Sequence, residues 1–408
     1  MLCVPLPQKE AMSTDIDFLY RPGFHFTPAK NWMNDPNGLV FHKGEYHLFY
    51  QHNPFGTKWG HMSWGHAVST DLLNWKHLDI AISEDADGAI FSGSAVSIGD
   101  EIVAIYTRHT ETNQTQCIAT SKDNGRTFTK FESNPVLDLD MADFRDPKVF
   151  RYEDQWIMAV VKPHEHVCVF YKSIDLIKWE FLSEFGPAAA IGGVWECPDL
   201  FPLTYNGEEL WVLLISLNPG AINNGTGTQY FVGSFDGVTF RPKYPIEKPR
   251  WLDHGRDNYA GATFNDAPDG RRIFIGWMAN WQDLGSHPAT SWTNAMTIPR
   301  ELGLTKIGEE IVLTQQPLCS PTYELIIDTT KKHRSGLTGF VELGYDPSTQ
   351  KIFVDNYTAD VKPVNNRIHL KVLVDQSSVE LYTKDGVCWI TMAVFPQPGV
   401  TRELTNFG

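Results

Sequence analysis

The chain has 408 residues, of which 42% are hydrophobic and 20% are charged. These fractions lie near the globular averages of about 45–50% and about 25%, which excludes a disordered or collagen-like chain. Acidic residues number 49 against 34 basic ones, so the formal net charge is −15. An acidic chain without concentrated Lys or Arg lacks the positive charge needed to bind nucleic acid or an anionic membrane. We therefore expect a folded protein that binds neither.

The N-terminal residues, 1–18, contain Pro5, Pro7 and Lys9 where a signal peptide would have an apolar core. This favours a cytoplasmic protein, with a secreted one as the alternative. The longest apolar run near the middle of the chain, Leu210 to Ile215, is much shorter than the ~20 residues of a membrane-spanning helix. We expect no membrane span.

The six cysteines show neither a CxxC pair nor the spacing of a disulfide framework. His61 with His66, and His164 with His166, lack the HExxH spacing and a third ligand. No Gly-rich phosphate loop follows a strand. We expect no metal and no cofactor.

A short pattern recurs along the first two thirds of the chain: Ser, any residue, Asp, a turn and then an aromatic residue. Its four aspartates are Asp71, Asp123, Asp175 and Asp236. Each copy follows a short strand-like run, and Asp or Gly in the turn favours a hairpin. A hairpin that recurs every ~50 residues is typical of a β-propeller. We predict an all-β fold whose residues 18–314 form a five-bladed β-propeller.

The remaining residues, 321–408, lack this pattern but still alternate as strands, for example from Asn366 to Asp375 and from Ser378 to Tyr382. We predict a second, C-terminal antiparallel β-domain. The region from Tyr323 to Tyr345 is short, which suggests a contracted domain.

Three segments place a carboxylate beside Pro, Gly or Trp in apolar surroundings. They contain Asp35, Asp146 and Glu196, which fall in different repeat units. The inner strands of a propeller line a central funnel, so inner-strand placement would bring the three carboxylates together. The alternative interpretation is three unrelated surface turns.

The neighbours of these carboxylates suggest a division of roles. Arg145 precedes Asp146 and would favour its ionised form. Trp195 and Cys197 flank Glu196 and would favour its protonated form if they bury it. One charged and one protonated carboxyl are what glycoside hydrolysis requires. The alternative for Arg145 is a structural salt bridge.

These motifs as a set resemble family 32 of the glycoside hydrolases, the β-fructofuranosidases, which include invertases, exo-inulinases and levanases. The resemblance runs from about Tyr20 to about Leu302, and the C-terminal strands resemble the family's β-sandwich. The segments that carry it are Trp32–Gly38, Phe49–Pro54, Trp59–Ala67, Phe91–Ser94, Arg145–Pro147 and Glu196–Cys197.

The resemblance implies that Asp35 is the nucleophile, Asp146 the transition-state stabiliser and Glu196 the acid/base. It also implies a set of substrate-binding residues, of which the last two rest on weaker matches: Asn34, Gln51, Trp59, Phe91, Ser92, Arg145, Tyr259 and Trp281. Asp283 stands where the family often has an aromatic residue, which suggests a different outer subsite. For Trp59 and Trp281, simple packing is the alternative.

The implied activity is a retaining, exo-acting hydrolase that releases terminal β-D-fructofuranosyl units from sucrose, inulin or levan, with a slight lean toward levan or inulin. One alternative is a fructosyltransferase that uses the same covalent intermediate. Another is a non-catalytic propeller lectin. The expected partner is therefore sucrose or a fructan, and the sequence leaves a homo-oligomer open.

Overall fold

The computed structural model describes residues 15–284 and 287–408. Cys3 and most of the N-terminal segment considered above lie outside the described residues. Within those two ranges the chain forms seven β-sheets, one α-helix, α1 (Ile16–Tyr20), and two short 3₁₀ helices, η2 (Pro268–Gly270) and η3 (Trp281–Asp283). None of the described helices is long and apolar enough to cross a membrane. The all-β prediction is confirmed.

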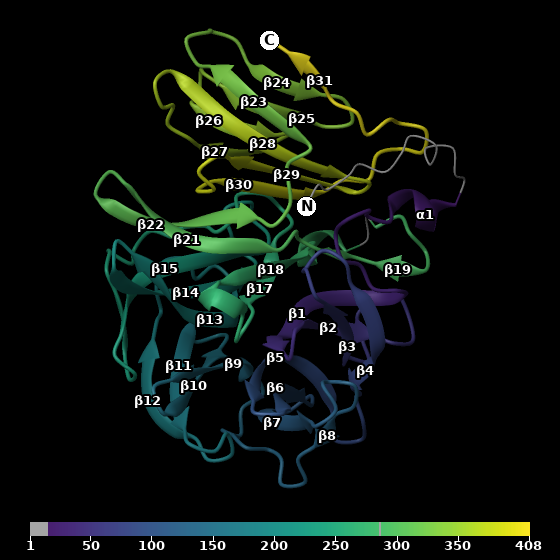
Figure 1. Ribbon diagram of the computed structural model, residues 1–408, viewed down its shortest axis with the longest axis vertical. Helices are drawn as coiled ribbons and strands as arrows, with labels where there is room; N and C mark the ends of the chain where they lie inside the picture. The colour runs from purple at the N-terminus through teal and green to yellow at the C-terminus, as the bar shows by residue number, and fades with distance from the viewer. Residues whose placement is uncertain (1–14, 285–286) are drawn as a thin grey trace.

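Five of the sheets fan out around a common centre in the lower part of Figure 1. Sheet 1 contains β1 (Asn31–His42), β2 (Glu45–Asn53), β3 (Ser63–Ser69), β4 (Lys76–Ile82) and β19 (Trp292–Thr293). Sheet 2 contains β5 (Ala89–Ile98), β6 (Glu101–His109), β7 (Gln114–Ser121) and β8 (Thr129–Lys130). Sheet 3 contains β9 (Arg145–Tyr152), β10 (Gln155–Lys162), β11 (Val167–Ser173) and β12 (Glu180–Phe185). Sheet 4 contains β13 (Val194–Tyr205), β14 (Glu208–Asn218), β15 (Gly227–Phe235) and β16 (Phe240–Pro242). Sheet 5 contains β17 (Tyr259–Thr263), β18 (Ile273–Met278), β20 (Ala295–Met296), β21 (Arg300–Ile307) and β22 (Glu310–Pro317).

The first strands of these sheets form a closed ring. β1 contacts β5, β5 contacts β9, β9 contacts β13, β13 contacts β17, and β17 contacts β1. The late strand β19 also pairs in parallel with β1, through Asn31 with Trp292 and Trp32 with Thr293. The end of the domain is thereby hydrogen-bonded to its beginning, which closes the propeller.

Both faces of a propeller sheet are buried, and this explains the apolar run from Leu210 to Ile215 on β14. Leu213 and Ile215 pack into the hydrophobic cluster between sheets 3 and 4. Val212 and Leu214 point the other way, into the cluster between sheets 4 and 5. Because side chains alternate along a strand, a strand covered on both sides needs apolar residues at every position.

The repeated Ser-x-Asp pattern forms the turn between the third and fourth strands of a sheet. In sheet 1, the Ser69 hydroxyl donates to Asp71 Oδ1 at 3.1 Å, and the same oxygen accepts the backbone N–H of Asn74 at 2.7 Å. In sheet 3, Ser173 and Asp175 make the same bonds at 3.1 Å and 2.9 Å. The side chains thus supply the hydrogen bonds that the turn backbone lacks.

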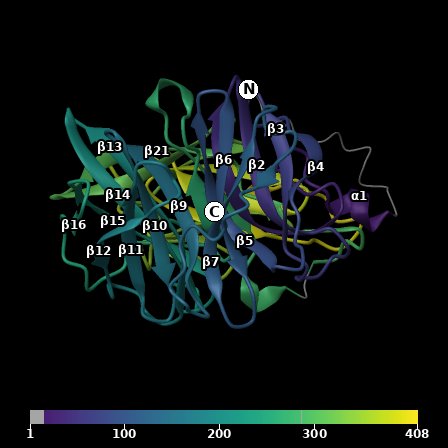
Figure 2. The same ribbon diagram turned by 90° about the horizontal axis from the view of Figure 1, so that it is seen from below.

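Two further sheets pack face to face above the propeller in Figure 1, and from below, in Figure 2, their yellow strands lie behind the propeller sheets. One contains β23 (Tyr323–Asp328), β28 (Arg367–Asp375), β29 (Ser378–Thr383) and β30 (Trp389–Ala393). The other contains β24 (Ser335–Thr338), β25 (Glu342–Asp346), β26 (Lys351–Val354), β27 (Tyr357–Asp360) and β31 (Thr405–Phe407). The predicted antiparallel C-terminal sandwich is confirmed.

A buried polar network joins the sandwich to the propeller. His25 bonds to Asp375 through Nδ1 at 2.8 Å and to Glu380 through Nε2 at 2.7 Å. Glu380 also accepts from Arg300 Nη2 at 2.6 Å, and Arg300 in turn pairs with Asp253 at 3.2 Å. Breaking such a buried pair costs about 3–5 kcal/mol because it strands an uncompensated charge. These contacts therefore specify how the two domains dock.

The network makes the stability of the protein depend on His25. Burial disfavours the imidazolium, but the hydrogen bonds and charges of Asp375 and Glu380 outweigh it and raise the pKa of His25 from 6.5 to about 9. A raised pKa gives stability that is complete below pH 6.5 and lost as pH rises through about 9. From the size of the shift, we expect the free energy of unfolding to fall by about 3 kcal/mol over this window. Urea unfolding at several pH values measures it.

The matched variant is His25→Gln, which should remove this part of the pH dependence. His333→Gln, which replaces an exposed histidine of the sandwich, should keep it. An unchanged slope in the His25 variant would contradict the assignment.

Candidate active site

The inner strand of every propeller sheet departs from regular pairing where it carries candidate residues. The register shifts lie between Met33 and Pro36, Ile90 and Gly93, Arg145 and Lys148, Glu196 and Asp199, and Tyr259 and Ala262. Asp146, Cys197 and Ala260 have φ of 65°, 48° and 52°, a region that non-glycine residues seldom occupy. Such bulges re-aim side chains. Here they turn residues from five sheets toward one place.

Asp35, on β1, lies among neutral donors. Its Oδ1 accepts from Asn34 Nδ2 at 3.0 Å and its Oδ2 from the Ser92 hydroxyl at 2.7 Å. Burial raises the pKa of Asp35 to about 6; the charge of Glu196 adds to this, and the bonds from Ser92 and Asn34 oppose it. The carboxyl therefore titrates near neutral pH.

Asp146, on β9, lies beside the same group of atoms. Its Oδ2 accepts the backbone N–H of Cys197 at 2.9 Å and lies 4.0 Å from Arg145 Nε. Burial raises the pKa of Asp146, Arg145 opposes this, and the charges of Glu196 and Asp35 raise it further. Arg145 does favour the ionised form of Asp146, as expected, but burial and two neighbouring carboxylates outweigh one guanidinium, so the pKa is raised overall.

Glu196, on β13, has the closer contact with Arg145. Its Oε1 accepts from Arg145 Nη2 at 3.1 Å and Nε at 3.2 Å, and its Oε2 accepts from the Tyr259 hydroxyl. The apolar surroundings expected from Trp195 and Cys197 were therefore wrong. The indole of Trp195 points away, into the core between sheets 3 and 4. Charged and polar donors face the carboxylate instead.

The remaining candidates lie around this centre at different depths. Asn34 is held by the indole N–H of Trp32 at 2.7 Å, and Trp281 stacks on Trp32 with ring centroids 6.2 Å apart. Phe91 adjoins Ser92, and Trp59, half exposed, contacts Phe91 edge-on. Gln51 is buried and donates to the Ile90 carbonyl at 3.0 Å rather than to a carboxylate.

Two residues that the sequence analysis gave no role also belong to the site. The Cys197 thiol lies 3.7 Å from Asp35 Oδ2 and 3.6 Å from Asp146 Oδ2, so it donates between two carboxylates. Asp143 pairs with Arg145 Nη1 at 2.6 Å. Both stand within three residues of a predicted site residue, and that adjacency was the available signal.

The histidines considered as metal ligands have other partners. His61 pairs with Glu84 at 2.6 Å, and His66 faces His47 at 3.0 Å. Across residues 15–284 and 287–408, no group of three or more His, Cys, Asp or Glu side chains is arranged to hold a metal.

Comparison with known proteins identifies the family to which the chain belongs. Residues 25–317 match the glycosyl hydrolases family 32 N-terminal domain, and residues 324–407 match the family 32 C-terminal domain. The chain belongs to glycoside hydrolase family 32. It is therefore a glycoside hydrolase, and the resemblance drawn from its motifs is confirmed.

Individual members of family 32 align along most of the chain. A levanase from Bacillus subtilis is 40% identical over 97% of this chain and 69% of its own length. An extracellular exo-inulinase from Meyerozyma guilliermondii is also 40% identical, over 92% of this chain and 90% of its own. The crystal structure of exo-inulinase from Aspergillus awamori superposes with a TM-score of 0.86 at 33% identity, over 93% of this chain and 94% of that one.

Proposed function

We propose that this family 32 hydrolase is a retaining, exo-acting fructosidase that releases terminal β-D-fructofuranosyl units from sucrose, inulin or levan. The observation that carries the proposal is that three carboxyl groups from sheets 1, 3 and 4 meet, with the Cys197 thiol between Asp35 and Asp146 and Arg145 beside Glu196. The levanase and exo-inulinase names of similar proteins support the substrate class.

In the proposed mechanism, Asp35 attacks the anomeric C2 of the terminal fructosyl unit. Its neutral donors, Asn34 and Ser92, hold the carboxylate in place without neutralising its charge. The bond from C2 to the leaving oxygen breaks as the bond to Asp35 forms, which gives a covalent fructosyl-enzyme.

Glu196 is the proposed acid/base. It protonates the leaving oxygen, and then takes a proton from the water that releases fructose. Arg145 and Tyr259 orient the two oxygens of Glu196.

Asp146 is the proposed transition-state stabiliser, which holds fructose hydroxyls opposite the reacting carbon. Asn34, Gln51, Phe91, Ser92, Arg145 and Tyr259 would line the fructose subsite, with Trp59 and Trp281 farther out. Hydrogen bonds that strengthen as charge develops at C2 lower the barrier more than uniform binding does.

Product analysis tests the proposed function. Sucrose, inulin and levan should each yield free fructose as the first product, and sucrose should give glucose and fructose in a ratio near one. An excess of free glucose would indicate a fructosyltransferase. Binding without turnover would indicate a lectin.

Replacing the nucleophile should abolish covalent catalysis while the fold remains. We expect Asp35→Ala to lower kcat by about 10⁴-fold or more, the scale seen for single members of cooperating catalytic sets. Steady-state kinetics with sucrose measures this, and Asp175→Ala, in an outer turn, is the control. Retention of more than roughly a tenth of kcat would remove Asp35 from this role.

Replacing the acid should affect substrates according to their leaving groups. Glu196→Gln should slow sucrose far more than an aryl β-fructofuranoside, whose leaving group needs no protonation. The basic limb of the pH–rate profile should disappear in the same variant. Equal slowing of both substrates would count against Glu196 as the acid.

The environment of Asp35 predicts the acidic limb of the pH dependence of kcat/KM. Since the nucleophile must be ionised and its pKa is about 6, kcat/KM should fall as pH drops through about 6. Ser92→Ala removes a hydrogen bond to the ionised form, so the limb should move to higher pH. Ser94→Ala is the control, because that hydroxyl donates to the Pro147 carbonyl instead. An unmoved limb in the Ser92 variant would contradict this.

A further inference from the structure

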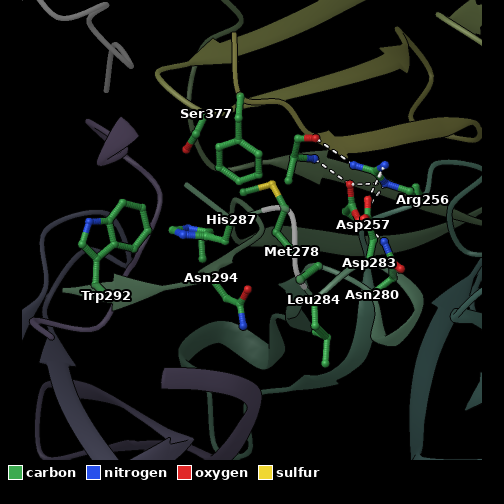
Figure 3. A pocket seen from close by; sticks show the side chains of 14 residues that line it. Arg256, Asp257, Met278, Asn280, Asp283, Leu284, His287, Trp292, Asn294 and Ser377 are labelled. Atoms are coloured by element: carbon green, nitrogen blue, oxygen red, sulfur yellow. Dashed lines mark hydrogen bonds and ion pairs between the residues drawn. The ribbon is translucent and has the colours of Figure 1, made fainter. Parts of the chain in front are cut away.

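Asp257, just before β17, is a fully buried carboxylate that makes no contact with the three catalytic candidates. Its Oδ1 accepts from Asn280 Nδ2 at 2.6 Å, and its Oδ2 accepts from the backbone N–H of Ala393 at 2.8 Å and from Arg256 Nε at 3.1 Å. Figure 3 shows these bonds converging on one side chain. The carboxylate joins three segments that are distant in sequence.

One of the three segments belongs to the C-terminal sandwich. Ala393 is the last residue of β30, and besides its bond to Asp257 its carbonyl accepts from Arg256 Nη2 at 3.1 Å. The backbone N–H of Asp257 also donates to the Thr391 carbonyl at 3.1 Å. Both the backbone N–H and the carbonyl group of Ala393, at the end of β30, are thus hydrogen-bonded to the Arg256–Asp257 pair.

The second segment leads from Asp257 to the acid/base. Two residues farther on, Tyr259 begins β17, and its hydroxyl donates to Glu196 Oε2. The intervening backbone is short and buried, so a shift at Asp257 moves the phenol directly. This is the first route from the sandwich to a catalytic carboxyl.

The third segment leads from Asp257 to the nucleophile. Asn280, held by Asp257, accepts the backbone N–H of Gln282 at 3.1 Å and so caps η3. Within η3, Trp281 stacks on Trp32, whose indole N–H holds Asn34, and Asn34 donates to Asp35. This is the second route.

Asp257 is itself only 1% exposed, which argues against a direct contact with substrate. The cavity in Figure 3, lined from the propeller and from Ser377 and Phe395 of the sandwich, has a volume of about 30 Å³. A cavity needs about 10–15 Å³ for each water molecule. It therefore has room for water but not for a sugar ring.

We propose that Asp257 is a positioning residue through which the C-terminal sandwich fixes the placement of both Glu196 and Asp35. The proposal rests on the proposed function of those two carboxyl groups. It gives the sandwich a part in catalysis without any contact with the fructosyl unit.

The test is Asp257→Asn, which keeps size and removes the charge. The amide keeps one acceptor oxygen but presents N–H groups in place of the other, so it can no longer accept from Asn280, Ala393 and Arg256 together. A displacement of about 1 Å can cost about 10²-fold in rate. We expect kcat per active site to fall on that scale, with KM for sucrose within about threefold of wild type.

Asp375→Asn is the matched control. Asp375 is an equally buried interdomain carboxylate, which holds His25 and the backbone of Gly23 and Phe24, but it contacts no residue on the two routes. This variant should lower the thermal midpoint and leave kcat per active site unchanged. If Asp257→Asn behaves in the same way, Asp257 is a docking contact only and the proposal fails.

A second variant covers the case in which Asp257→Asn does not fold. Asn280→Ala breaks the route to Trp281 and leaves the bond to Ala393 and the Tyr259 segment intact. We expect it to lower kcat per active site by less than Asp257→Asn does, with KM for sucrose again within about threefold of wild type, and unchanged kinetics would contradict the second route. Absence of fructose release by the wild-type enzyme would instead reject the proposed function, so the two failures are distinguishable.

Discussion

The structure depends on one constraint: a strongly apolar sheet must have both of its faces covered. Each propeller sheet satisfies this by packing between two neighbours, so the series of sheets has to close on itself. The parallel pairing of β19 with β1 completes that closure. Once the ring is closed, the first strand of every sheet is forced toward the centre. Side chains separated by more than a hundred residues in sequence then meet there.

Closure of the ring also brings three acidic side chains together at the site. Three carboxyl groups converge there, and burial penalises the ionised forms of Asp35 and Asp146. A single guanidinium, Arg145, balances part of this charge, and it bonds to Glu196 rather than to the adjacent Asp146. Asp35 has only neutral donors. The carboxyl groups therefore differ in their partners, and this difference fits the proposed division into nucleophile and acid/base.

Much of the architecture could be predicted because it follows from local sequence patterns. The Ser-x-Asp turns are short-range hydrogen-bonding units, and they appear in the structure as expected. The partners of the carboxyl groups could not be predicted in this way. Tyr259 reaches Glu196 across 63 residues, and Arg145 lies closer to Glu196, at 3.1 Å, than to the adjacent Asp146, at 4.0 Å, which no motif encodes. Adjacency in sequence suggested the pair Arg145–Asp146, whereas the fold paired Arg145 with Glu196.

The same reasoning bears on the sandwich, whose strands contribute nothing to the centre of the ring. A ring of sheets can open slightly wherever one sheet is less well held, and sheet 5 is the one whose inner strand, β17, is short and whose neighbouring segments are loops. The sandwich binds this sheet at two places: the His25–Glu380–Arg300 network and the Arg256–Asp257 pair with β30. The first, the His25–Glu380–Arg300 network, stabilises the docking of the sandwich on the propeller by an amount that depends on pH. The second binds the segment that ends in Tyr259 and the turn that carries Trp281, the two parts of sheet 5 that reach the catalytic carboxyl groups. By fixing sheet 5, the sandwich would fix the positions of the proposed catalytic carboxyl groups, although it does not itself contact them.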